Sequence, residues 1–463
     1  MTDIKKDIFE IGGEVLLAFN QGEFAPDGAA TKEGAVKQSE SKELDDIRVR
    51  VGTLLKAEMV SFLLGAGASV DCGGQLIGTV PLVVERDLLS EGVHGTRRPR
   101  VCKWLDLFYR AVYYAGASDS PRTRDAILAR RAVLDGEKIE PLNASFEQVL
   151  AMLHRWRSAL PESGGRLRIE GSASVDARAE DLEEAIHRAT RALALSCVLP
   201  VTNNETGLAI YNTFLRKVLT RPLNLKRVNI FTLNYDTLIE QAADAEGVVL
   251  LDGFVGAQRR IFRPESYEQD LYFPAETTEG RVHRFDRVLH LYKLHGSITW
   301  TASEPTIDNP YGIESIAFGR DEAKRVLIYP TPAKYGETLG MPYADLFRRF
   351  VATLVRPQSV LFVIGYGFGD EHVNAIIRQA LAVPSFTLVI VDPDPKSDFV
   401  KKLREQQDLR VWITEGPRIG RFAGFVKDIL PDLRDEEIRK KVLATHRALE
   451  KGSQGSGGET SGE

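Results

Sequence analysis

The sequence of 463 residues contains only three cysteines, Cys72, Cys102 and Cys197. Because they form no C-x-x-C pair, the chain can build neither a disulfide framework nor a structural zinc site. No apolar run approaches the roughly 20 residues that a transmembrane helix needs, and the N-terminal stretch lacks the apolar core of a signal peptide. These absences predict a cytoplasmic protein that neither spans a membrane nor requires a metal.

An excess of charge of either sign is also missing. Lysine and arginine number 60 against 65 aspartates and glutamates, so the net charge is −5 and the pI is near 6.0. This balance gives no global reason to expect nucleic-acid or membrane binding. The basic clusters RRPR near residue 97 and RRIFRP near residue 259 are more typical of solvated faces than of phosphate contacts. We therefore expect no direct nucleic-acid binding.

Four apolar runs of strand length lie near residues 61, 228, 360 and 386. Each is followed by a polar or glycine-bearing turn and then a helical pattern, as in parallel strands joined by crossover helices. The fold class predicted is α/β, a Rossmann-like and mostly parallel sheet with a mostly helical insertion. The predicted division is an N-terminal helical arm at 1–57 with a flexible loop at about 21–42, a sheet domain at 58–80 and 226–450, the helical insertion at 81–225 and a disordered tail at 451–463.

The first run leads into the stretch FLLGAGASVDCGG, with Gly65 and Gly67 at the strand end. Such glycines let the backbone approach a ligand closely, and a following helix N-terminus attracts phosphate. The third glycine of the dinucleotide-binding pattern G-x-G-x-x-G is replaced by Val70. A small-residue turn without a ligand therefore remains an equal alternative.

The second run leads into FTLNYDTLIEQAAD, which places Thr232, Asn234 and Asp236 at the carboxyl end of a strand. Ligands bind at this edge of open α/β sheets. Asn234 or Asp236 could instead cap the helix that follows, since both residue types suit that position. The two roles do not exclude each other.

The third run leads into VLFVIGYGFGDEHVN, where Gly365, Gly367 and Gly369 precede Asp370, a candidate helix cap. Three glycines carry a backbone entropy cost that a simple turn does not require. We therefore expect this loop to approach a ligand closely. Asp392 follows the next strand, at a position where doubly wound proteins use an acid to bind a ribose hydroxyl.

The stretch HLYKLHGSITW ends a buried strand with His295. An imidazole titrates near neutral pH and can act as a general base. On the strand alone, a core histidine bonded to a backbone carbonyl is the simpler interpretation, and the neighbouring motifs reverse that preference. His283 and His290 are expected to be structural or surface groups, whereas His372 follows the glycine-rich loop and could face a ligand.

Together these stretches resemble the sirtuin family, with its Gly-Ala-Gly-x-Ser loop, Thr-x-Asn-x-Asp strand end, His-Gly pair and late glycine-rich loop. The resemblance covers roughly residues 58–85 and 225–415. Further stretches, among them LDGFVGAQRRIFRP, LIYPTPAKYGETLG and YADLFRRF, look like the bacterial sirtuin-like proteins of anti-phage defence, in particular the subgroup encoded beside a HerA-like hexameric ATPase.

This resemblance implies an NAD pocket, with NAD as the substrate rather than a permanent cofactor. His295 would be the general base, Asn234 would position water or ribose, and Asp236 would support the nicotinamide side. The residues expected to bind NAD are Gly65, Ala66, Gly67, Ser69, Thr232, Gly365, Tyr366, Gly367, Phe368, Asp370 and Asp392. Asp392, the residue for the adenosine ribose, would repel a 2′-phosphate.

Two departures from the deacylating sirtuins bear on the reaction. Three scattered cysteines cannot form the zinc ribbon, and CGGQLIGTV stands where those enzymes carry Pro-Asp-Phe-Arg. Without the module that helps to form an acyl-lysine groove, water is the favoured acceptor. The hypothesis is therefore NAD glycohydrolase activity, giving nicotinamide and ADP-ribose, in an abortive-infection type of defence.

An active NADase would poison its own cell, so the activity must be restrained until it is needed. The resemblance implies a large homo-oligomer and a HerA-like ATPase partner, with contacts expected in the segment at 21–42 and in the helical insertion. Three alternatives remain, namely an NAD- or ADP-ribose-binding regulatory subunit without catalysis, an NAD-dependent protein deacylase or ADP-ribosyltransferase, and a subunit that processes nucleic acid.

Overall fold

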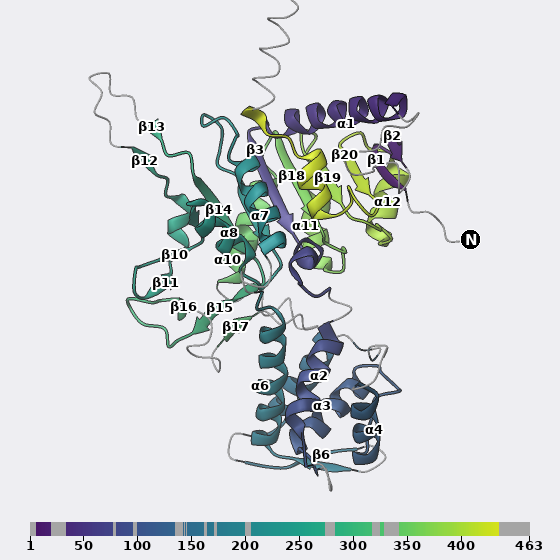
Figure 1. Cartoon of the computed structure of the whole chain (residues 1–463). Coiled ribbons are helices and arrows are strands. Elements are labelled where there is room, and N and C mark those ends of the chain that lie inside the picture. The colour runs from purple at the N-terminus through teal and green to yellow at the C-terminus, as the bar shows by residue number, and fades with distance from the viewer. Residues whose placement is uncertain are drawn as a thin grey trace, which may run out of the picture.

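The computed structural model arranges the chain as a large sheet domain with a separate helical domain beneath it (Figure 1). It describes residues 6–19, 34–76, 80–95, 100–134, 142, 144, 146–161, 164–170, 174–199, 205–273, 283–316, 325–327 and 342–434. Within these ranges, no helix is both long enough and apolar enough to cross a bilayer.

The main sheet has nine strands in the order β2-β1-β20-β19-β18-β3-β8-β14-β9. All neighbouring pairs from β20 to β9 are parallel, whereas β1 pairs antiparallel with both β2 and β20. The strands are β1 (Asp7–Ile11), β2 (Glu14–Phe19), β3 (Met59–Leu64), β8 (Asn229–Thr232), β9 (Val249–Leu251), β14 (Val288–Lys293), β18 (Ser359–Ile364), β19 (Thr387–Val391) and β20 (Val411–Glu415). The four apolar runs of the sequence are β8, β3, β18 and β19, and the predicted fold class is confirmed.

The strand order reverses between β3 and β18. After β3 the chain adds β8 and β14 on one side, and it then returns to place β18, β19 and β20 on the other. In open α/β sheets, ligands bind beyond the carboxyl ends of the strands at such a reversal. The topology therefore puts the candidate site at the ends of β3 and β18.

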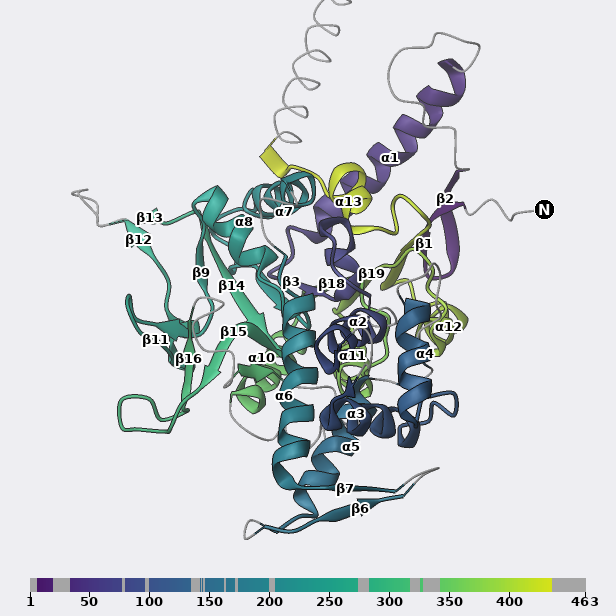
Figure 2. The same ribbon diagram turned by 60° about the horizontal axis from the view of Figure 1, so that its bottom comes forward.

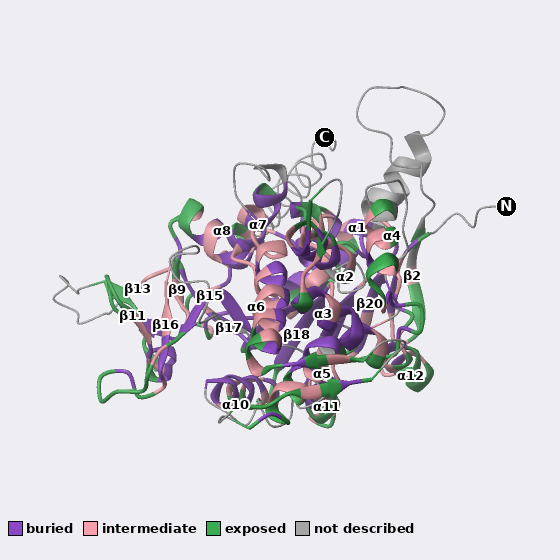
Figure 3. Cartoon of the chain, turned by 90° about the horizontal axis from the view of Figure 1, so that it is seen from below, coloured by how far each residue is buried: buried purple, intermediate pink, exposed green. Residues whose placement is uncertain are grey.

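Helices cover both faces of this sheet, which explains why every residue of β3 and β18 is buried. One face packs against α1 (Gly34–Leu54), α7 (Glu205–Val218) and α8 (Leu238–Glu246). The other packs against α10 (Tyr343–Leu354), α11 (Glu371–Leu381) and α12 (Asp398–Gln406). Seen from below, the central strands are buried between these layers (Figure 3).

A smaller sheet of five strands is built from segments on both sides of β14 in the chain. Its strands are β10 (Phe254–Val255), β11 (Arg260–Phe262), β16 (Ile313–Ser315), β15 (Gly296–Ala302) and β17 (Arg325–Leu327), in that spatial order. A separate pair, β12 (Tyr272–Phe273) with β13 (His283–Arg284), extends away from the body (Figure 1). Because β15 begins directly after His295, the small sheet forms one wall beside the candidate site.

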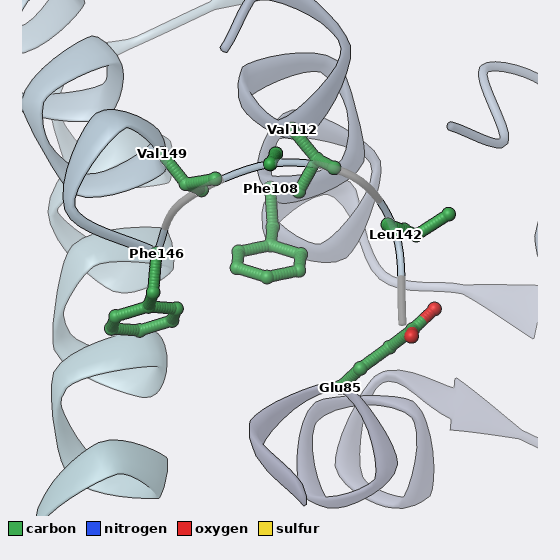
Figure 4. A pocket seen from close by; sticks show the side chains of 7 residues that line it. Glu85, Phe108, Val112, Leu142, Phe146 and Val149 are labelled. Carbon is green, nitrogen blue, oxygen red and sulfur yellow. The ribbon is translucent and has the colours of Figure 1, made fainter. Parts of the chain in front are cut away.

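The helical domain has its own apolar core, built from α2 (Val80–Gly92), α3 (Lys103–Tyr114), α4 (Arg124–Leu134), α5 (Phe146–Ser158) and α6 (Ala179–Ser196). Two short pairs complete it, β4 (Val93–His94) with β5 (Arg100–Val101), and β6 (Leu167–Ile169) with β7 (Val175–Ala177). Figure 2 shows β6 and β7 at the far end of this domain. A cavity of about 20 Å³ lies between α2, α3 and α5, lined mainly by apolar side chains (Figure 4). It has room for about one water molecule.

Three boundaries predicted from the sequence are wrong. Residues 7–19 form two strands rather than a helical arm, and the part of the expected loop from Gly34 onward is already helical in α1. The helix α7 was predicted to belong to the insertion, but it packs into the core of the main sheet. The rest of the expected loop, at 20–33, and the tail at 451–463 lie outside the described residues.

Candidate functional site

Two glycine-bearing loops contact each other at the strand reversal, one after β3 and one after β18. The Gly67 amide donates to the Gly365 carbonyl at 2.8 Å, and Gly365 has a φ of +63°. A Cβ on Gly67 would lie 2.7 Å from the Gly365 Cα, and a Cβ on Gly65 would lie 2.6 Å from the Gly365 oxygen. Glycine is therefore required at these three positions because the two backbones touch.

This contact corrects the interpretation of the loop after β18. Close approach to a ligand was the expected reason for all three of its glycines, but Gly365 is explained by the neighbouring loop. Gly367 and Gly369 have open space where a Cβ would stand. Ligand approach therefore remains the expectation only for these two.

The strand end after β8 meets the loop after β3 through a cluster of polar side chains. The Asn234 Nδ2 donates to the Ser69 Oγ and to the Gly65 carbonyl, both at 3.0 Å. The Ser69 hydroxyl in turn donates to the Asp236 Oδ2 at 2.7 Å. Ser69 is 3% exposed, so its contacts form away from bulk water. These hydrogen bonds join three of the residues predicted for the site.

Asp236 contacts both the start of α8 and the loop after β3. Its Oδ1 accepts from the Leu238 amide at 3.1 Å and its Oδ2 accepts from the Ser69 hydroxyl, but the cap residue of α8 is Thr237 rather than Asn234 or Asp236. Thr232 lies at the end of β8, where its hydroxyl donates to the Leu64 carbonyl at 3.3 Å and accepts from the Asn234 amide at 3.0 Å. The Thr232 side chain therefore shapes the turn.

His295 contacts an acid from the opposite side of the strand reversal. Its Nε2 lies 3.3 Å from the Asp370 Oδ2, and the two side chains are 9% and 10% exposed. The His295 ring also lies beside Phe347 of α10, at 6.3 Å between ring centroids. The Nε2 atom of His295 therefore faces a carboxylate.

The loop that carries Asp370 is held from within. The Tyr366 hydroxyl accepts from the Asp370 amide at 3.0 Å, and the Asn374 Nδ2 donates to the Phe368 carbonyl at 2.9 Å. The Asp370 Oδ1 accepts from the His372 amide at 3.0 Å and caps α11. Tyr366 and Phe368, both predicted to bind NAD, are each only 6% exposed and pack into the core. Their side chains therefore fix the loop by packing into the core.

Burial and nearby acids keep several groups around this cluster neutral. Burial first, and the Asp236 charge second, raise the pKa of the Tyr211 phenol, whose hydroxyl lies 3.4 Å from the Ser69 Oγ. Burial also raises the pKa of Cys72 and of Cys197 to about 12 each, again with Asp236 as the next cause. Both thiols are therefore protonated at neutral pH, which argues against a cysteine nucleophile here.

One family model matches part of the chain. Residues 228–412 match the SIR2-like domain. The matched segment begins at β8 and ends within β20, so it contains Asn234, His295 and Asp370 but not the Gly65 loop. No curated protein matches the chain. A mutant of a Sir2 homologue, solved in complex with ADP-ribose, aligns with 78% of this chain and 95% of its own at 9% identity and a TM-score of 0.27.

Within the matched segment, Asp392 follows a different strand from the residues of the polar cluster. It follows β19, its Oδ1 accepts from the Asp394 amide at 2.8 Å, and its own amide donates to the Thr414 carbonyl. Burial raises the pKa of this carboxyl, as do the charges of Asp394 and Glu415. Because the Gly365 amide donates to the carbonyl of Val391, the acid still borders the glycine-rich loop.

The other histidines occupy different settings. His290 lies on β14, and burial lowers its pKa to about 4, so it is a neutral structural group as predicted. His372, in the first turn of α11, packs edge-on against Phe347 at 4.6 Å between ring centroids. The Phe347 ring therefore contacts both His372 and His295.

Sequence reasoning missed two residues that shape the surroundings of the polar cluster. Lys293, a charge within an otherwise apolar strand, donates to the Asp236 carbonyl. Its position in the run LHLYKLHG was a detectable signal, because lysine is almost never fully buried unless it is paired. Tyr235 packs against the helical domain and against Ile298, and its carbonyl accepts from the Ile298 amide at 3.1 Å. No pattern in the sequence indicated that contact.

Proposed function

We propose that this protein hydrolyses NAD at the bond between nicotinamide and ribose, releasing nicotinamide, ADP-ribose and a proton. The observation that carries the proposal is the pairing of His295 with Asp370 beside the Asn234–Ser69–Asp236 cluster. The match of residues 228–412 to the SIR2-like domain supports it. The strand reversal, where α/β proteins bind their ligands, supports it as well.

The chemistry requires a group that accepts a proton near the anomeric carbon. Cleavage passes through an oxocarbenium-like state, which water must attack from the face opposite nicotinamide. His295 takes a proton from that water or from a ribose hydroxyl, and the Asp370 carboxylate orients the ring and stabilises the imidazolium that forms. The buried setting of both side chains strengthens this interaction, because water screens it less.

The remaining residues bind and orient NAD. The backbones of Gly367 and Gly369 stand open to the diphosphate, and Asn234 positions the water or the ribose. Asp236 supports the nicotinamide side, held by the Ser69 hydroxyl. Asp392 binds the adenosine ribose, from the neighbouring strand end.

The decisive experiment is NAD consumption with identification of the products. Wild type is compared with His295→Ala and Asn234→Ala, each alone and with a co-expressed HerA-like ATPase. We expect ADP-ribose and nicotinamide from the wild type and a loss of turnover of about 10²- to 10⁴-fold in His295→Ala, the usual contribution of a general base. His94→Ala, an exposed histidine of the helical domain, is the matched control and keeps full activity.

Two results would overturn the assignment. Deacylation of peptides, with NAD left intact in their absence, would make the protein a deacylase. NAD or ADP-ribose binding without turnover in any condition would make it a regulatory subunit that senses the nucleotide.

The biological setting is proposed on sequence resemblance alone. The chain acts as a regulated effector of anti-phage defence, within a large homo-oligomer that binds a HerA-like hexameric ATPase. Co-purification of the two proteins and mass measurement of the complex test this. A chain that stays monomeric over a wide concentration range, with or without the ATPase, would contradict it.

A further inference from the structure

Lys293 places a buried positive charge directly behind the site. It is the last residue of β14, and its side chain is only 4% exposed. Burying an ammonium group away from water is costly unless the protein supplies partners. The partners of Lys293 therefore indicate what the charge does.

Those partners belong to one short segment at the carboxyl end of β8. The Lys293 ammonium donates to the backbone carbonyl of Asp236 and, at 3.0 Å, to the Glu240 Oε1. Glu240 lies in the first turn of α8, which begins two residues after Asp236. One side chain of β14 thus holds both the residue that ends the turn and the helix that follows it.

Asp236 is consequently fixed from two directions. Its carboxylate is bound by Ser69 and by the Leu238 amide, and its carbonyl is bound by Lys293. The first two contacts orient the side chain, whereas the third sets the position of the backbone from which that side chain leaves. A displacement of the carbonyl would move the carboxylate away from Ser69.

The ion pair borders a cavity rather than solid packing. Its volume is about 240 Å³, and its walls come from α8, β14 and the small sheet, including Glu240, Lys293, Asp252, Arg260 and Trp300. The Glu240 Oε2 has no hydrogen-bond partner among the described residues. Burial raises the pKa of Glu240, and the Lys293 ammonium opposes that rise. A space of this size beside the ammonium can admit a small amine.

We propose that Lys293 is a positioning residue for NAD cleavage, acting through the Asp236 carbonyl to hold Asp236 against the nicotinamide end of the substrate. The inference rests on the proposed function in that it takes NAD as the ligand. It adds a residue that touches neither NAD nor water in the reaction. Glu240 serves as the counter-charge of the buried ammonium.

The test compares binding of NAD with binding of ADP-ribose, which lacks nicotinamide. Both are measured by calorimetry in the His295→Ala background, so that NAD is not consumed. Adding Lys293→Met is expected to weaken NAD binding about tenfold, as loss of one charge-assisted hydrogen bond implies. The affinity for ADP-ribose stays within about twofold of the unsubstituted background. Equal loss for both ligands, or loss for neither, overturns the proposal.

Two further variants separate positioning from folding. Lys293→Met combined with Glu240→Gln removes both buried charges, so it tests the same selective loss without leaving an unpaired acid. Lys217→Met removes a lysine of α7 whose ammonium donates to the Val426 and Leu430 carbonyls at 2.6 and 2.7 Å, near the C-terminal end of the described chain. This matched control is expected to preserve both affinities.

Chemical rescue completes the experiment in the active enzyme. In Lys293→Ala, ethylammonium is expected to enter the cavity and restore turnover at least about fivefold, whereas it leaves His295→Ala inactive. If the Lys293→Ala variant is folded and its rate of NAD turnover equals that of the wild type, the proposal is overturned. If the wild type binds NAD but never cleaves it, the hydrolase assignment is refuted. The role of Lys293 is still decided in that case, because the calorimetric comparison requires only binding.

Discussion

His295 and Asp370 lie 3.3 Å apart, from Nε2 to Oδ2, although they follow strands that are not neighbours. His295 follows β14 and Asp370 follows the loop after β18, with β3 and β8 between those strands in the sheet. The side chains therefore reach across the strand ends that carry Ser69 and Asn234. The ends of β3 and β8, which carry the polar cluster, thus lie between the two strands that the His295 imidazole and the Asp370 carboxylate follow.

Replacing Asp370 by asparagine separates the two roles of its carboxylate. Asparagine caps a helix about as well as aspartate, so α11 and the free energy of unfolding should change little. Without the negative charge, the imidazolium of His295 loses its stabilising partner, and we expect NAD turnover to fall on the order of 100-fold. Steady-state kinetics and thermal unfolding measure the two effects. Glu371→Gln, at an exposed neighbouring acid, should change neither, and unaltered turnover in Asp370→Asn would refute the role of this pair.

Alanine at Gly365 is expected to destabilise the fold by at least about 2 kcal/mol. The substitution combines a left-handed backbone with overlap against the loop after β3. Gly367→Ala is the matched control, because a Cβ there meets open space and the free energy of unfolding should stay within about 0.5 kcal/mol. Denaturant unfolding measures both values. Equal stability of the two variants would show that the loops do not require glycine for their mutual contact.

The stability of the protein should fall at acidic pH partly because of His290. Burial lowers its pKa to about 4 from an ordinary value of 6.5, so the unfolded chain binds a proton more readily than the folded one. Its contribution to stability is complete above about pH 6.5 and is lost as the pH falls toward 4, by up to about 3 kcal/mol.

Unfolding titrations of wild type and His290→Phe between pH 4 and pH 7 test this linkage. The phenylalanine variant should show a shallower fall in stability, since its ring takes up no proton. His94→Phe, at an exposed position, should keep the slope of the wild type. Parallel curves for wild type and His290→Phe would contradict the assignment.

The sequence predicted the central sheet well because its strands are local patterns. The runs that became β3 and β18 are apolar throughout, and each ends in glycine, so composition alone located both strands and the edge at which they terminate. The helix cap at Asp370 was similarly readable, since a cap depends on neighbouring residues.

Contacts between distant segments were not predictable in this way. The pairing of β1 with β20 joins residues near the two ends of the described chain, and the short stretch DIFEI carries no sign of its partner. Gly365 suggested close approach to a ligand, whereas glycine is required there because the backbone of Gly67 lies against it. Lys293 signalled a buried charge, but only the fold revealed that it binds the Asp236 carbonyl.

Tyr235 determines how this protein can be dissected. It stands between Asn234 and Asp236, yet its ring packs with the helical domain, next to Ala194 of α6 and Ile298 of β15. Excising residues 80–199 would strip the apolar cover from Tyr235 and Ile298 in the segment that carries the candidate catalytic residues. We therefore expect the matched segment, residues 228–412, to be less stable without α6 than with it.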